Sequence, residues 1–88
     1  MDQDARLRRL QFRAWHRGTK ESDLMVGGYF NRYAAQWTAE QIDWFEAFLE
    51  EEDVEIVAWA MGTMPIPDRL RGGMMDAFCK LDFVDPTA

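Results

Sequence analysis

The sequence predicts an all-α protein that folds as a single compact bundle of about five short helices. Apolar residues recur at spacings of three and four, which is typical of amphipathic helices, and no long stretch alternates with period two. Helix-capping residues, glycines and prolines divide the chain into short segments. The chain has 88 residues, enough for one domain and not two. We expect one domain over residues 1–88, with residues 1–4 and 83–88 frayed.

The first helix is expected to start at Asp4 as its cap and to run to about Trp15. Its apolar positions recur at helical spacing and are Leu7, Leu10 and Ala14. Gly18 is suited to the left-handed conformation just past the end of a helix.

A second helix is expected after Thr19, which can cap it, and acids in its first turn suit the helix dipole. Its apolar face is predicted to consist of Leu24, Met25, Tyr29, Tyr33 and Trp37. Gly27 and Gly28 lie inside this helix, where each costs about 0.5–1 kcal/mol relative to alanine. Either the helix is locally weak there or another backbone packs close.

The third helix has a clear start, because Thr38 and Gln41 match a capping box. The apolar residues that follow at helical spacing are Ile42, Phe45, Phe48 and Leu49.

Asp53 is expected to cap a short fourth helix, whose apolar residues are Ile56, Val57, Ala60 and Met61. A loop follows at Gly62, Pro65 and Pro67. The last helix is predicted to begin at Asp68 and to carry Leu70, Met74, Phe78 and Leu81.

Charge is acidic overall and unevenly spread. The formal net charge is −6, which argues against nucleic-acid binding because that needs a basic surface. Residues 1–20 hold six bases and two acids, whereas residues 38–55 hold eight acids and no base. Two interpretations stay open: helix faces that attract each other weakly, or a polarised surface that orients the protein on a partner.

The compartment is suggested by two features. Cys79 is the one cysteine of the chain, so no internal disulfide can form and a reducing compartment is expected. No apolar run approaches the roughly 20 residues that span a bilayer. We therefore expect a cytoplasmic protein with no membrane partner.

The residues give little support to an enzyme. A nucleophilic Cys–His pair would rest on chance proximity, because His16 and Cys79 are far apart in sequence. One His and one Cys cannot supply a zinc site without carboxylates, and the acids of residues 50–55 lack the alternating ligands and the central glycine of a calcium loop. The glycine pairs lack the spacing of a phosphate-binding loop. We expect no catalytic residue and no metal site.

One stretch is more specific: Arg17-Gly18-Thr19-Lys20-Glu21-Ser22-Asp23-Leu24. It resembles the R-G-x-x-E-x-D-L signature of the succinate dehydrogenase assembly factor family, whose members help attach FAD covalently to the flavoprotein subunit. The block from Thr38 to Trp59 also resembles the family, with its capped helix, acid cluster, Asp53, Glu55 and Trp59. The resemblance covers roughly residues 5–65, and Gly27-Gly28 departs from it.

The resemblance implies a function and a site. The partner would be the succinate dehydrogenase flavoprotein subunit, with the fumarate reductase flavoprotein as a second candidate. The helper would bind no cofactor tightly and would act on FAD held by the partner. Partner-binding residues carried over from the family pattern are Arg17, Gly18, Glu21, Asp23, Asp53 and Trp59.

Roles for these residues follow from the same resemblance. Arg17 would offer a planar donor fork to the partner, Gly18 would allow close backbone approach, and Glu21 would accept from partner donors or orient Arg17. Asp53 could instead be a helix cap that also makes a contact, and Trp59 could be a core ring. We expect a monomer when the protein is free. The alternative is a small acidic interaction module or regulator that binds a basic partner through residues 38–55.

Overall fold

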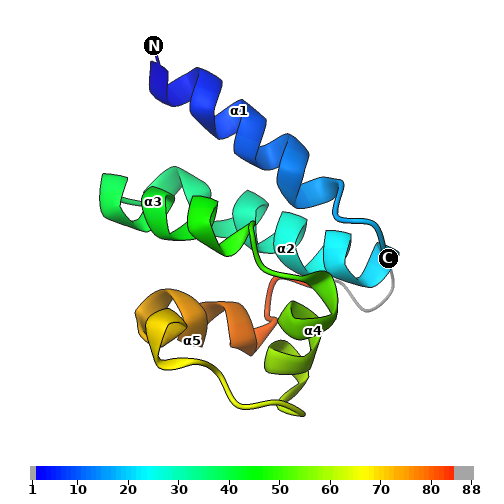
Figure 1. The fold of residues 1–88 in the computed structure, drawn as a ribbon. Coiled ribbons are helices and arrows are strands. Elements are labelled where there is room, and N and C mark those ends of the chain that lie inside the picture. The colour runs from blue at the N-terminus through cyan, green and yellow to red at the C-terminus, as the bar shows by residue number, and fades with distance from the viewer. Residues whose placement is uncertain (1, 85–88) are drawn as a thin grey trace.

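The computed structural model describes residues 2–84, which form five α-helices and two short 3-10 turns with no strand among them (Figure 1). The α-helices are α1 (Asp2–Trp15), α2 (Lys20–Tyr33), α3 (Ala39–Phe48), α4 (Asp53–Met61) and α5 (Gly73–Lys80). The 3-10 turns are η1 (Ala34–Gln36) and η2 (Asp68–Leu70). The predicted all-α bundle is confirmed.

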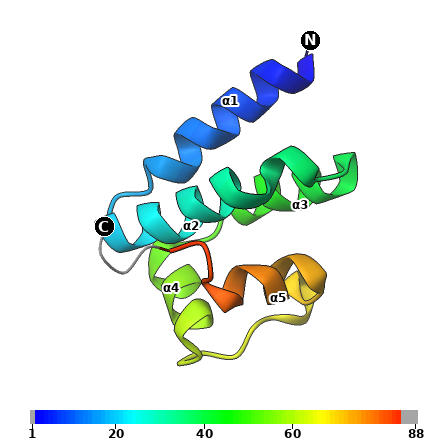
Figure 2. The same cartoon turned by 180° about the vertical axis from the view of Figure 1, so that it is seen from behind.

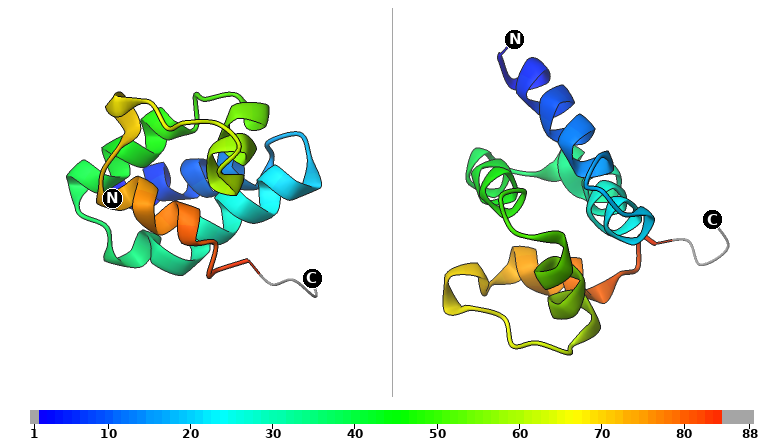
Figure 3. Two further views of the ribbon diagram at one scale, coloured as in Figure 1. Left: turned by 90° about the horizontal axis from the view of Figure 1, so that it is seen from below. Right: turned by 45° about the vertical axis from the view of Figure 1, so that its right-hand side comes forward.

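The helices stack in three tiers. α2 and α3 form the middle tier, α1 lies against α2 on one side, and α4 and α5 lie on the other (Figures 1 and 2). The long connection between α4 and α5 runs along the outer edge of that last pair (Figure 3). This order places the α1–α2 connection close to the start of α4.

Aromatic side chains fill the core around Tyr29, which is 1% exposed. Its ring contacts five others at centroid distances of 5.3–6.1 Å: Tyr33, Trp37, Phe45, Phe78 and Phe83. The hydroxyl of Tyr29 donates to the Met74 carbonyl at 2.8 Å, so this buried polar group is satisfied. Burial also raises the pKa of the Tyr29 phenol, which keeps it neutral.

Two predicted helix starts are confirmed. Thr19 has extended backbone and its side chain accepts from the Ser22 N–H. Thr38 and Gln41 form the reciprocal hydrogen bonds of a capping box.

Two other predicted caps are wrong. α1 already includes Asp2, so Asp4 lies inside the helix. Asp53 is the first residue of α4, and the residue before it, Glu52, makes no side-chain cap. The Asp53 carboxylate is turned instead toward Arg17, which donates to it.

The apolar face of α2 differs from the prediction. Its buried residues are Ser22, Val26, Gly27, Tyr29 and Phe30. Leu24 and Met25 are half-buried, and Trp37 lies beyond the helix because α2 ends at Tyr33.

A side chain, not another backbone, explains Gly27. A Cβ at Gly27 would overlap the ring of Trp15, which packs directly on this glycine. Gly28 faces the ring of Phe83, 3.2 Å from where its Cβ would be. The glycine pair therefore allows one aromatic ring from each end of the chain to lie against α2.

The last predicted helix is interrupted. Asp68–Leu70 is only a 3-10 turn, and α5 begins at Gly73 because Gly72 has a φ of 144°, which breaks the helical path. Leu81 falls just past the helix with a φ of 54°. Met61, one of the apolar residues expected on the fourth helix, is 61% exposed.

The chain ends were expected to be frayed over residues 1–4 and 83–88. Residues 2–4 belong to the first turn of α1, and Phe83 packs against the core. Residue 1 and residues 85–88 lie outside the described residues.

Candidate functional site

The connection from α1 to α2 is centred on Arg17, whose guanidinium bridges to the junction between α3 and α4. Its Nε donates to Asp53 Oδ1 at 2.8 Å, and its terminal nitrogens donate to the carbonyls of Leu49 at 2.5 Å and Glu51 at 2.6 Å. Leu49 and Glu51 lie at the end of α3, where carbonyls lack helical partners. Arg17 therefore satisfies that end and anchors the start of α4.

This geometry changes the role expected for Arg17. Its side chain is only 10% exposed and its donors point to acceptors of its own chain. The structure places Arg17 under the surface, as a bridge between segments 32–36 residues apart. A partner would meet the groups that it holds in place.

Gly18 and Asp23 shape the same connection. Gly18 has a φ of 124°, a backbone conformation that is strained for any residue with a side chain. A Cβ at this position would lie 3.5 Å from Asp53 Oδ2. The Asp23 carboxylate accepts from the Arg17 backbone N–H at 2.6 Å, which fixes the turn. Gly18 is exposed, whereas Asp23 is half-buried.

Glu21 and Asp53 come together at the surface. With Thr19, Val54 and Val57 they line a hollow of about 470 Å³ between the first turns of α2 and α4. Glu21 is exposed and makes no ion pair with a described residue. Val54 is 77% exposed. The hollow therefore combines an apolar wall with an available carboxylate.

Trp59 is not part of this surface. It is 3% exposed, which confirms the interpretation as a core ring. Its indole N–H is buried and has no hydrogen-bond partner among the described residues. A ring so buried does not act as an exposed anchor.

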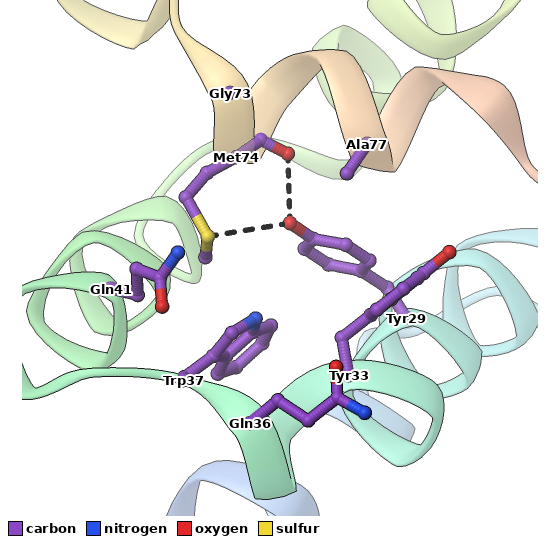
Figure 4. Close-up of a pocket in the computed structure, with 8 residues that line it drawn as sticks. All are labelled: Tyr29, Tyr33, Gln36, Trp37, Gln41, Gly73, Met74 and Ala77. Carbon is purple, nitrogen blue, oxygen red and sulfur yellow. Dashed lines mark hydrogen bonds between the residues drawn. The ribbon is translucent and has the colours of Figure 1, made fainter.

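A second hollow, of about 350 Å³, lies at the other end of α2 and is drawn in Figure 4. Its walls come from α2, η1, α3 and α5, and Tyr29 and Met74 close its floor through their hydrogen bond (Figure 4). None of the candidate residues lines it.

The bases of the first helix and the acids of residues 43–50 form ion pairs within the molecule. Arg6 pairs with Asp43 and Glu46, both at 2.7 Å, and Arg13 pairs with Glu50. The interpretation of mutually attracting faces therefore holds for α1 and α3. These pairs join the outer tier to the middle one.

The lone His and Cys have local roles in the structure. His16 lies at the end of α1 with its Nδ1 2.6 Å from the Phe12 carbonyl, as expected for a helix-end residue. Cys79 is half-buried, and burial raises the pKa of its thiol, which disfavours the reactive thiolate. No group of His, Cys, Asp and Glu suited to a metal ion occurs within residues 2–84.

Sequence reasoning missed part of the hollow. Val54 was not singled out, and Val57 was noted only as one of the apolar residues of the fourth helix. The available signal was the apolar composition of α4 on all sides, since a helix of this kind at the surface leaves an apolar face uncovered. No described helix is long and apolar enough to cross a membrane.

Comparisons with known proteins find a matching family and several similar chains. Residues 8–82 match the profile of a family described as the flavinator of succinate dehydrogenase. The FAD assembly factor SdhE of Acetobacter pasteurianus is 45% identical over 64 residues, which cover 73% of this chain and 59% of that protein. The mitochondrial succinate dehydrogenase assembly factor 2 of Lodderomyces elongisporus is 33% identical over 69 residues, 75% of this chain and 42% of that protein.

The match to yeast proteins is similar in extent. The mitochondrial succinate dehydrogenase assembly factor 2 of Saccharomyces cerevisiae strain S288c is 30% identical over 69 residues, 75% of this chain and 43% of that protein. The chain thus spans about half the length of the relatives that it matches.

Proposed function

The chain belongs to the family of succinate dehydrogenase flavinators, and from this premise we propose that it binds the flavoprotein subunit of succinate dehydrogenase and promotes its covalent attachment to FAD. The observation that supports this role best is the hollow between α2 and α4, where the family motif and the acid cluster meet. Glu21 and Asp53, 32 positions apart in the sequence, share its wall.

The proposed mechanism divides the motif between support and contact. Arg17 fixes the start of α4 against the start of α2, so Asp53 and Glu21 keep one relative position. Glu21 then accepts hydrogen bonds from the partner, and Gly18 lets the partner's backbone come close. A rigid surface of this kind can hold two parts of a partner in a reactive arrangement.

The bond itself is proposed to form between FAD and a side chain of the flavoprotein. The helper then supplies no nucleophile and binds no FAD tightly, and we propose that it is not an enzyme. Its contribution is to orient the partner so that the reacting atoms meet often, which can account for a large part of a rate enhancement.

Three further proposals concern its setting. The fumarate reductase flavoprotein is a second candidate partner. The free protein is proposed to be a monomer, and its single Cys79 fits a reducing compartment such as the cytoplasm.

The test is co-expression of the flavoprotein subunit with no helper, with the native chain, with Glu21→Ala, or with Glu40→Ala. Glu40 is a matched control, because it is also an exposed acid in a first helical turn and lies outside the hollow. Covalent flavin is read as fluorescence of the denatured subunit.

We expect a strong band with the native chain and with Glu40→Ala, and a band several-fold weaker with Glu21→Ala or no helper. Equal bands with and without the native chain would contradict the function. A helper-dependent band that Glu21→Ala leaves unchanged would keep the function and remove Glu21 from the site.

A further inference from the structure

The outer face of α4 carries an apolar stripe. Val54, Val57, Ala58 and Met61 follow one another at spacings of three, one and three, so they lie on one side of the helix. Ile56 and Trp59 lie on the opposite side and are buried. Val54 is 77% and Met61 61% exposed, whereas Val57 and Ala58 between them are half-buried. The stripe therefore covers about two turns, on the order of 10 Å of helix.

Such a stripe is unusual on a small protein. A surface helix normally turns a polar face to water, and a helix that is apolar on all sides is normally buried. In α4 only Asp53 and Glu55 are polar, and both lie in its first turn. The other large exposed apolar residue within residues 2–84 is Phe12, which stands alone on α1. Contiguous exposed apolar residues mark interaction sites.

Carboxylates border the stripe on both sides. Glu55 follows Val54 on one edge and Asp53 precedes it on the other. Glu21 stands across the hollow that Val54 and Val57 line. Asp53 already accepts from Arg17, so Glu21 and Glu55 are the bordering carboxylates that make no ion pair with a described residue.

We propose that this stripe docks an apolar segment of the flavoprotein subunit that is flanked by Lys or Arg side chains. The inference rests on the proposed function and adds to it the chemistry of the contacting segment. The stripe packs against the apolar side chains of the segment, and Glu21 and Glu55 pair with its flanking bases and set its register.

The charges argue against two other occupants. A second copy docked through the same face would bring two chains of formal net charge −6 together, and α4 holds acids and no base to offset that repulsion. The negative surface of an anionic membrane would be repelled by the same groups. An apolar protein segment flanked by bases is complementary both to the apolar stripe and to the carboxylates beside it.

The experiment measures affinity for the purified flavoprotein subunit by titration calorimetry. The test variant is Val54→Gln with Met61→Gln, both at exposed helical positions, so the variant keeps the native melting temperature. Phe12→Gln is the matched control, because Phe12 is 63% exposed and lies on α1. Glu55→Lys is paired with Glu40→Lys, since both acids lie in first helical turns.

We expect the double variant to weaken binding about tenfold or more, as truncation of interface anchors does. Glu55→Lys should weaken it several-fold, whereas Phe12→Gln and Glu40→Lys should stay within about twofold of native.

Native affinity in the double variant would overturn this inference and leave the proposed function standing. Absence of any binding by the native chain would overturn the proposed function and this inference with it. Self-association or flotation with anionic vesicles that the double variant abolishes would also overturn it, in favour of a second copy or a membrane.

Discussion

At the residue scale, Arg17 is the residue that joins the motif to the rest of the fold. Its planar fork meets two backbone carbonyls and one carboxylate, an arrangement that a guanidinium fits and an ammonium does not. Substitution of Arg17 thus acts first on the position of α4 and only then on binding. Arg17 is therefore a supporting residue, whereas Glu21 is the proposed contact residue.

We predict that Arg17→Lys lowers the free energy of unfolding by about 2 kcal/mol or more, because breaking a largely buried pair leaves polar groups unsatisfied. Glu21→Ala, at an exposed position, should change it by less than about 0.5 kcal/mol. Urea denaturation of the three proteins gives both values. Equal stabilities for native and Arg17→Lys protein would contradict the bridging role.

A second prediction concerns Gly27. Gly27→Ala should destabilise the protein by about 1–3 kcal/mol, because its methyl group overlaps the Trp15 ring and forces α1 from α2. Gly73→Ala is the matched control, since nothing lies within 4 Å of its Cβ and the position is helical. That control should be neutral or stabilising, by up to about 1 kcal/mol.

The measurement compares the melting temperatures of Gly27→Ala and Gly73→Ala protein with that of the native chain. A Gly27→Ala protein at least as stable as native would show that Trp15 does not pack on this glycine in solution.

At the element scale, the helices were predictable where the signal is local. Thr19 and Thr38 cap through atoms three residues away, so their patterns can be read along the chain. Asp53 could not be placed in this way. Four acids in a row offer several possible caps, and the contact with Arg17, distant in sequence, decides which one starts α4.

The faces of the helices were harder to predict than their existence. Phe30 is buried because its ring packs against Trp37 and Phe45, which is a fact of tertiary structure. Met61 was grouped with the apolar residues of the fourth helix, and the sequence does not show that it is exposed, unlike Ile56. The break at Gly72 was missed because a positive φ leaves no pattern in neighbouring residues.

The candidate site was predictable in part. The motif resemblance pointed to Glu21 and Asp53, which the structure brings to one hollow. It could not show that Arg17 turns inward or that Val54 stands exposed beside them, because both depend on how α4 meets α2.

The connection between α4 and α5 yields a third prediction. Arg69 in η2 pairs with Glu51 at the end of α3, and this hydrogen bond lowers the pKa of the Glu51 carboxyl. A carboxyl whose pKa is lowered in the folded state adds stability above its unfolded pKa and loses it as pH falls through the folded value. The pair should therefore stabilise the fold near neutral pH and not in acid.

The measurement compares melting temperatures of native and Arg69→Gln protein from pH 7 to pH 3. The difference should be present at pH 7 and should shrink toward pH 3, and it should be small throughout because the Arg69 side chain is largely exposed. A difference that is constant over this range would contradict the role of Glu51.

At the scale of the whole molecule, internal pairing bears on the choice of function. Much of the acidic run faces bases of its own chain, with Glu46, Glu50, Glu51 and Asp53 all in ion pairs. A general acidic module would leave these groups to its partner. Within residues 38–55, Glu40, Glu52 and Glu55 make no ion pair with a described residue. Glu21 and the stripe of α4 are the exposed features that lie together beside the motif, which supports a defined docking surface.

The central claim is that the flavoprotein subunit is bound at the starts of α2 and α4. Hydrogen–deuterium exchange of the native chain, with and without that subunit, tests it most directly. The account predicts that added protection is concentrated in residues 18–24 and 53–61, with little change in residues 39–48. Protection confined to α1 and α3, or no protection at saturating subunit, would contradict it.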